Sequence, residues 1–289
     1  MFIDADADVT MYPPPHHGRL SLRTKLREFF TTKIREDVLL EAELLALSFA
    51  TGVGDATTYS EFRVFTANHT GNTLLLAVGV TENWSGRQLV NGIPIPLQLI
   101  GISLSMFVLG SLVPGQLGNL FGCQRRWWLM ANNFFQFALV FIASMLQAYT
   151  MGWDAGPASK LVIDQWSMGV IALLAFSAGG QVAVARSLGM TEITTANATS
   201  AYVDMFIDKN LFRPVNRSRN RRICFLLSLC AGSFSGGFTY QKLGPAKTLF
   251  ISSMGKGVVT VLLLFNKGGS FRKRCSCAKD IDSKFDSNS

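Results

Sequence analysis

Lys256 is the residue whose position says most about chemistry, because charged side chains are rare in the middle of apolar segments. It lies in the apolar stretch 246–265, about ten residues from either end, which is about 15 Å of helix on each side. A lysine side chain does not extend that far, so we expect its ammonium group inside a helix bundle, next to a carboxylate or another polar ligand. Asp55, towards the end of the first apolar stretch, is the predicted partner. Such a pair either binds a solute or has a purely structural role.

A second group of polar residues lies in the segment 62–80. His69 is the only histidine outside the N-terminal tail, and Asn68 and Thr70 flank it. It is either a proton relay or donor to a solute, or a packed histidine with satisfied partners. Asn68, Thr70 and Asn72 suit the N-cap of a helix that begins there, and the free N–H groups of that helix attract an anionic or polar group. The alternative is that they only satisfy an interrupted backbone.

The segment 191–207 contains a related set, in which Asn197 and Thr199 occupy corresponding places. If both segments dip into a bilayer from opposite faces, the two sets meet near its midplane. The predicted solute-binding residues are therefore Asp55, Asn68, His69, Thr70, Asn72, Asn197, Thr199 and Lys256.

Recognisable catalytic patterns are absent from the sequence. It contains no phosphate-binding Gly-x-x-x-x-Gly-Lys-[Ser/Thr] loop, no His-Glu-x-x-His and no Gly-x-Ser-x-Gly. Its three histidines, two of them in the tail, cannot form a histidine-rich metal site. We expect no enzyme activity, no metal and no cofactor.

The composition indicates a membrane protein. Only 16% of the 289 residues are charged and 48% are hydrophobic, whereas about 25% of residues are charged in soluble domains. Eighteen of the 27 basic residues lie in 1–37, 208–222 and the tail from 267, as in cytoplasmic flanks of membrane spans. A nucleic-acid partner is not expected, because such proteins interleave basic and aromatic residues on one face. The expected partner is the lipid bilayer, while the particular membrane and the oligomeric state stay open.

The two tails carry their own predictions. Within the cytoplasmic tail 1–37, Leu22, Leu26, Phe29 and Phe30 have helical spacing with basic residues between them. This pattern is typical of an amphipathic helix on an anionic leaflet, or of a solvated helix before the first span. In the basic cytoplasmic tail 267–289, Cys275 and Cys277 are either palmitoylated or ordinary thiols.

Eight apolar stretches are candidates for spans, two of them are doubtful, and 191–207 is too polar to face lipid. The segment 191–207 contains Glu192, Asn197 and Asp204, and 62–80 is the other doubtful one. If the basic clusters 1–37 and 208–222 share a side, an even number of crossings separates them, so both segments cross or neither does. We predict an all-α bundle of six spans plus two re-entrant or broken segments, with both termini cytoplasmic. The other six stretches are 39–59, 94–113, 127–150, 165–187, 223–241 and 246–265.

An internal repeat supports two halves, 38–150 and 165–266. Residues 66–70 read Thr-Ala-Asn-His-Thr, and residues 195–199 read Thr-Ala-Asn-Ala-Thr. Small-residue runs precede both, at 49–54 and 176–181, and Gly-Ser-x-x-x-Gly runs follow both, at 110–115 and 232–237. Because three spans per half is an odd number, the halves insert in opposite orientations, which is a 3+3 inverted repeat typical of secondary transporters. The same topology places the glycosylation sequon at Asn83 outside.

The runs from Gly52 to Ala56 and from Ala67 to Asn72 resemble the YoaK-like family of multipass membrane proteins, a domain of unknown function. The resemblance covers about residues 38–266 and departs in the second half, where Thr199-Ser200-Ala201 replaces Thr-Gly-Asn. It implies a six-span membrane domain and brings no substrate with it. We expect a secondary transporter or channel-like carrier of a small polar or anionic metabolite. The alternative is a non-transporting scaffold or accessory protein of a biosynthetic or trafficking pathway.

Overall fold

The structure is a computed structural model that describes residues 22–34, 37–84, 89–90, 93–157, 161–190, 198–213 and 216–266. Within these ranges the chain is helical except for a two-stranded antiparallel hairpin of β1 (Leu89–Val90) and β2 (Ile93–Pro94). The all-α prediction is therefore confirmed for the main elements. The helices are α1 (Leu22–Thr31), α2 (Val38–Phe62), α3 (His69–Trp84), α4 (Leu97–Phe121), α5 (Arg126–Met151), α6 (Gln165–Ser187), α7 (Ala198–Phe206) and α8 (Arg217–Leu262).

Polar caps set where several helices begin. Asp37 accepts the backbone N–H of Leu40 at the start of α2. Asp164 and Ser167 form a capping box at the start of α6. Asn216 accepts the N–H of Arg219 at the start of α8. These side chains satisfy N–H groups that the first turn of a helix leaves without partners.

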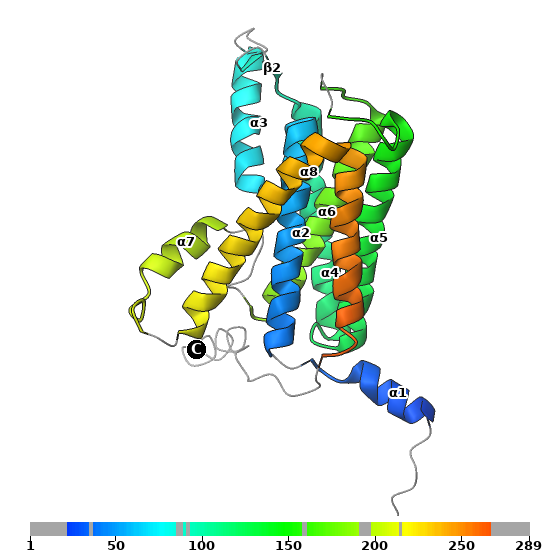
Figure 1. The fold of residues 1–289 in the computed structure, drawn as a ribbon, viewed down its shortest axis with the longest axis vertical. Helices are drawn as coiled ribbons and strands as arrows, with labels where there is room; N and C mark the ends of the chain where they lie inside the picture. The colour runs from blue at the N-terminus through cyan, green and yellow to red at the C-terminus, as the bar shows by residue number, and fades with distance from the viewer. Residues whose placement is uncertain are drawn as a thin grey trace, which may run out of the picture.

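The helix α8 consists of two arms, 217–243 and 245–262. They meet at Gly244, whose φ of 79° and ψ of 177° are not helical, followed by Pro245. Figure 1 shows the first arm in yellow running to the upper end of the bundle and the second, in orange, running back beside α5. Glycine is required at the turn, because a Cβ there would lie 1.9 Å from the carbonyl oxygen of Ala155.

Both predicted broken segments contain a short helix. The chain leaves α2 at Arg63, which adopts a left-handed conformation, and α3 starts only at His69. In Figure 1, α3 begins near mid-height of the bundle and runs to the end where α2 finishes, whereas α7 begins near mid-height and runs towards the other end. Residues 191–197 of the second segment lie outside the described residues.

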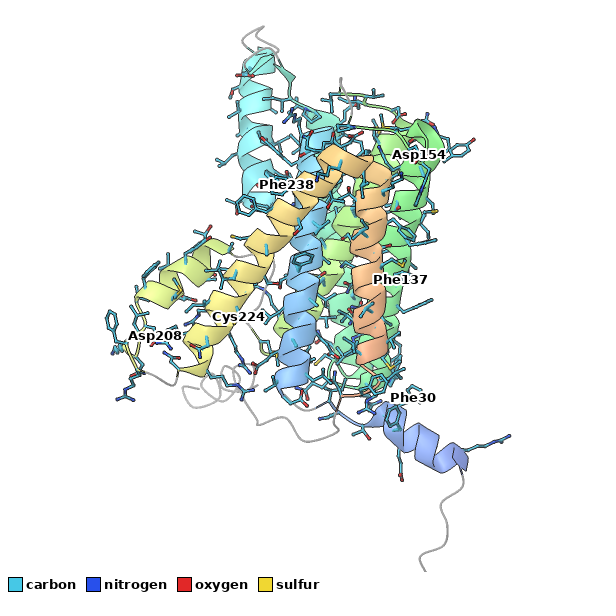
Figure 2. All side chains as sticks on the ribbon, viewed as in Figure 1. Phe30, Phe137, Asp154, Asp208, Cys224 and Phe238 are labelled. Carbon is cyan, nitrogen blue, oxygen red and sulfur yellow. The ribbon has the colours of Figure 1, made fainter. Side chains whose placement is uncertain are left out.

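Four helices in the described part of the chain are long and apolar enough to cross a membrane, namely α4, α5, α6 and α8. The predicted span 39–59 corresponds to α2, which is not among them. Large apolar side chains cover outer faces of the bundle, including Leu120, Phe134 and Phe238, which are 59–79% exposed. Phe238, labelled in Figure 2, projects from the first arm of α8.

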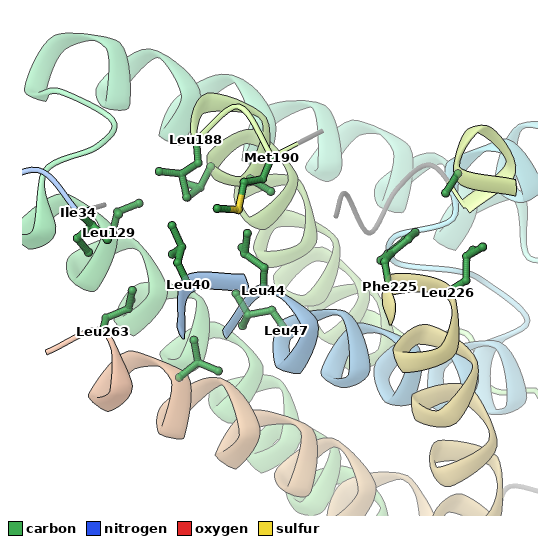
Figure 3. Packing of buried hydrophobic residues seen from close by; sticks show 14 residues of the cluster. Ile34, Leu40, Leu44, Leu47, Leu129, Leu188, Met190, Phe225, Leu226 and Leu263 are labelled. Carbon is green, nitrogen blue, oxygen red and sulfur yellow. The ribbon is translucent and has the colours of Figure 1, made fainter. Parts of the chain in front are cut away.

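The buried apolar residues form two clusters. One lies at the end of the bundle where α2 begins, and it joins Leu40, Leu44 and Leu47 of α2 to residues of several other helices (Figure 3). The other surrounds Ile100, Val170 and Leu249. Because both clusters draw on α2 or on the helices packed around it, α2 is the central helix of the structure (Figure 1).

Glycines set the closest helix contacts. A Cβ on Gly52 of α2 would lie 2.4 Å from the carbonyl oxygen of Leu229 in α8, and a Cβ on Gly179 of α6 would lie 2.3 Å from that of Phe107 in α4. The pairs α2–α8 and α4–α6 therefore approach backbone to backbone, as small residues permit in membrane helices.

Candidate functional site

Figure 1 shows the starts of α3 and α7 near each other. A cavity of about 410 Å³ is lined by residues of both. Asn68 and Thr70 line it from the start of α3, and Thr199 lines it from the first turn of α7. α2 contributes Asp55 and Tyr59, and α8 contributes Ser233. The cavity thus lies between the starts of α3 and α7 and brings together four predicted site residues: Asp55, Asn68, Thr70 and Thr199.

Asp55 fixes the turn that precedes α3. Its Oδ1 atom accepts the backbone N–H groups of Thr66 at 2.8 Å and of Ala67 at 2.9 Å. The hydroxyl of Thr66 donates to the same oxygen at 2.9 Å. A carboxylate with this many donors organises the interrupted backbone and at the same time borders the cavity.

Asn72 is fully buried and holds the same turn from the other side. It accepts the N–H of Phe65 at 3.0 Å and donates to the carbonyl oxygen of Phe65 at 2.7 Å. Ser103 of α4 also donates to that carbonyl, at 2.7 Å. Asn72 therefore clamps the backbone, and it is not among the residues that line the cavity.

His69 lies in the first turn of α3 and is half-buried. Its Nε2 is 3.0 Å from the carbonyl oxygen of Thr66, and its ring lies 3.9 Å from the ring centre of Phe107. These contacts place it behind the turn, outside the cavity lining.

Lys256 is buried in the bundle core, as its position in the sequence predicts, but its predicted partner is wrong. Its Nζ donates to Oε1 of Gln181 at 2.6 Å and to Oε1 of Gln136 at 3.2 Å. Asp55 instead binds the turn before α3, and no ion pair of Lys256 occurs among the described residues. Two amide oxygens thus take the place of the expected carboxylate, and Gln181, which the sequence analysis did not single out, donates onward to Thr51 at 3.0 Å.

Two buried carboxylates of α2, those of Glu61 and Glu43, are not among the residues that the sequence pattern singles out. Glu61 accepts from Tyr240 at 2.8 Å and from Gln147 at 3.2 Å. Glu43 accepts from Asn266 at 2.7 Å, and its other oxygen has no partner among the described residues. The sequence does contain a signal for them, since acidic residues in a central helix of an apolar bundle need polar partners.

The remaining predicted sites are not tested. Asn197, Cys275 and Cys277 lie outside the described residues. Asn83 is in the last turn of α3, and Ser85 of its sequon is also outside them.

Comparison with known families decides the affiliation of this domain. A family model described as "Protein of unknown function (DUF1275)" matches residues 44–262, which is most of the chain. The chain belongs to the DUF1275 family. The YoaK-like resemblance is consistent with that family, and the match lies within the predicted domain 38–266. No curated protein and no solved structure gives a significant match. The DUF1275 assignment therefore identifies the family of the chain but does not identify a substrate.

Proposed function

We propose that this DUF1275 protein is a secondary transporter or channel-like carrier of a small polar or anionic metabolite. The observation that carries the proposal is the cavity of about 410 Å³ between the first turns of α3 and α7. Discontinuous helices that meet near mid-membrane are the usual place for solute binding in secondary transporters. The N-terminus of α3 favours an anionic group of the solute, and Asp55 is an acceptor for a donor group of the solute.

The proposal includes six crossings arranged as a 3+3 inverted repeat. The crossings are α2, α4, α5, α6 and the two arms of α8. Matched glycine contacts support the repeat: a Cβ on Gly110 would lie 2.2 Å from the carbonyl oxygen of Phe176, and a Cβ on Gly232 would lie 2.1 Å from that of Phe49. Both contacts involve the same two motifs, a Phe in a small-residue run and the first Gly of Gly-Ser-x-x-x-Gly.

The proposed orientation places the start of α2 in the cytoplasm, and both termini with it. Lys33, Arg125 and Arg186 lie at that end of the bundle, with the arginines around the start of α8. Fewer basic residues lie at the other end in the described part of the chain, namely Arg63, Lys242 and Lys247. Basic residues accumulate on the cytoplasmic side of membrane proteins, so this asymmetry supports the orientation.

Binding and transport test the proposal in two steps. Purified protein is screened with amino acids, carboxylates, sugars and nucleosides, and a ligand of the folded state raises the Tm. The compound that stabilises most is then followed into reconstituted vesicles. Ser233→Leu fills the cavity and is expected to abolish both stabilisation and uptake, whereas Ser235→Leu, at an exposed position two residues on, preserves them. Equal uptake by wild type and Ser233→Leu would contradict a solute site in this cavity.

A scaffold role is the second candidate, and the position of α1 favours it. This helix lies crosswise below the bundle (Figure 1), and Arg126 of α5 contacts the ring of Phe29 at 3.9 Å. An exposed helix held at the membrane surface is suited to recruiting partners. Deletion of residues 1–31 separates the two functions: a carrier keeps its uptake, whereas a scaffold loses its cellular function while cavity variants remain silent.

A further inference from the structure

Two small voids with polar residues in their lining lie inside the bundle, beyond the solute cavity. One, of about 20 Å³, is lined by Glu43, Gln136 and Gln181 among others. The other, of about 30 Å³, is lined by Gln181, Lys256 and Thr66 among others. Each has more than the ~10–15 Å³ that one water needs, and each offers several polar partners. Because Gln181 borders both, the voids follow each other from Glu43 to Thr66.

Hydrogen-bond directions in the second void define what it can hold. The hydroxyl of Thr51 donates to the carbonyl oxygen of Leu47 at 2.9 Å, and that of Ser252 donates to Ala50 at 2.9 Å. The hydroxyl of Thr66 donates to Asp55. These hydroxyl hydrogens are already in use, so their oxygens present lone pairs to the void.

Lys256 supplies the hydrogen that these lone pairs lack. An ammonium group has three N–H donors, and two of them bind Gln136 and Gln181. The third is available to a water in the void, which Lys256 and Thr66 both line. Such a water accepts from Lys256 and donates to the Thr66 oxygen. The donors of Lys256, this water and Thr66 then point in one direction, from Lys256 towards Asp55.

We propose that Lys256, one water and Thr66 form a proton pathway that ends on Asp55. In the transfer, an N–H bond of Lys256 breaks and its proton passes to the water. The water gives a proton to the Thr66 oxygen, and Thr66 passes its own hydroxyl proton to Oδ1 of Asp55. The ammonium becomes a neutral amine, the carboxylate becomes a neutral acid, and no electrons are exchanged.

Protonation of Asp55 changes the solute cavity. Oδ1 accepts the N–H groups of Thr66 and Ala67, and a protonated oxygen accepts them less well. The turn before α3 is then held less firmly, and α3 carries Asn68 and Thr70 into the cavity lining. In this form the inference rests on the proposed function and names the proton as the coupling ion.

Few other titratable groups face this pathway. Near Asp55, α2 contributes Tyr59 to the cavity, and α3 contributes His69 behind Thr66. The cavity residues of α7 and α8 have no titratable side chains. Around Lys256, the described lining residues from α2, α5 and α6 are neutral, and the next ionisable group is Glu43 in the adjoining void. Asp55 is thus the acceptor that the Thr66 hydroxyl reaches directly.

Infrared spectroscopy of the full-length protein in lipid nanodiscs tests the pathway without a solute. The stretching band of a protonated carboxylic acid is followed after a rapid drop in pH, and its loss in Asp55→Asn assigns it. Thr66→Val removes the relaying hydroxyl and is expected to slow the appearance of this band at least tenfold. Lys256→Met is expected to slow it as well. Thr66→Ser retains the hydroxyl and should restore the wild-type rate, and Thr73→Val, at an exposed position of α3, is the matched control.

The outcomes separate the pathway from the proposed function. An unchanged rate in both Thr66→Val and Lys256→Met would overturn the pathway, even if vesicles take up a solute. Slowed protonation in Thr66→Val with rescue by Thr66→Ser supports the pathway, even if no solute is transported. If Lys256→Met fails to fold, the Thr66 series alone decides.

Discussion

Asp55 and Asn72 illustrate how polar side chains inside an apolar bundle divide their roles. Both bind the backbone of the turn 63–68, Asp55 through Thr66 and Ala67, and Asn72 through Phe65. Only Asp55 also borders the cavity. An interrupted helix leaves backbone groups that water cannot reach, so side chains must pair with them. The backbone of the turn before α3 is therefore held in place by side chains of α2 and α3.

Replacing Asn72 tests this clamp. Asn72→Leu keeps the approximate volume but leaves the N–H of Phe65 without its acceptor, which we expect to cost about 1–3 kcal/mol. The free energy of unfolding, measured by denaturant titration in detergent micelles, reports the loss. Asn68→Leu, at an exposed position four residues earlier, should change stability little. Equal stabilities of the two variants would show that the clamp contributes nothing.

Asp208, in the loop between α7 and α8, gives a pH-dependent prediction. The backbone N–H of Asn210 is the main cause that holds the pKa of Asp208 below its ordinary value, and the side chain of Asn216 adds to it. A carboxylate with a lowered pKa stabilises the folded loop above its unfolded pKa, and this contribution is lost as the pH falls through the folded pKa. We expect Asp208→Asn to reduce the exchange protection of the Asn210 amide at neutral pH. The difference from wild type should vanish at low pH, and a difference that persists there would contradict the prediction.

For single residues, the sequence predicts which side chains are buried better than it predicts which side chains they contact. The burial of Lys256 follows from its distance to the ends of one apolar stretch, which is a local property. Its partners Gln136 and Gln181 come from two other helices, and helix rotation and packing decide which side chains meet. The pairing with Asp55 was wrong for this reason.

The helix pairs α2–α8 and α4–α6 meet at glycines. In both pairs, a Cβ on the glycine would lie at nearly the same distance from a backbone oxygen of the other helix. We predict that Gly52→Ala and Gly179→Ala each destabilise the protein by about 1–3 kcal/mol, because the added methyl groups meet backbone atoms. Gly237→Ala and Gly101→Ala point into open space and should be neutral or slightly stabilising. Thermal unfolding of the four variants in one detergent compares them. Different effects at positions 52 and 179 would argue against equivalent helix pairs.

The turn at Gly244 is the second prediction at the level of elements. Gly244→Ala requires a conformation that is essentially restricted to glycine, which costs about 1–3 kcal/mol before the clash with Ala155 is added. We expect loss of the folded protein or a clear fall in Tm, measured beside Gly237→Ala in the same helix. Wild-type stability in Gly244→Ala would show that the two arms can be joined differently.

The elements were predicted more completely than the site. Apolar length placed the helices, and α3 and α7 begin inside the polar segments 62–80 and 191–207. The boundaries moved where caps decide them, as for α4, which continues to Phe121 beyond the predicted end at 113. No partners were predicted for Glu61 and Glu43 of α2, because Tyr240 and Asn266 are distant in the sequence.

The molecule as a whole has two chemically different ends, and Figure 2 shows Asp154 and Asp208 at opposite ones. The proposed orientation puts Asp154 outside and the loop around Asp208 in the cytoplasm. In a cysteine-free background, Asp154→Cys should react with a membrane-impermeant maleimide on intact cells, and Asn210→Cys only after permeabilisation. Both positions are exposed, so access depends on sidedness. Labelling of both positions from the same side of the membrane would exclude the six-crossing arrangement.

Acidic side chains of α2, near the beginning of the domain, bind residues near its end. Glu41 binds Arg217 and Arg221, Glu43 binds Asn266, and Glu61 binds Tyr240. During synthesis α2 therefore emerges long before these partners exist. Until the final hairpin has been made, its acidic groups must be held by water or by the insertion machinery. Chains that stop before residue 217 should consequently be recognised as unfinished and degraded, however apolar their remaining helices are.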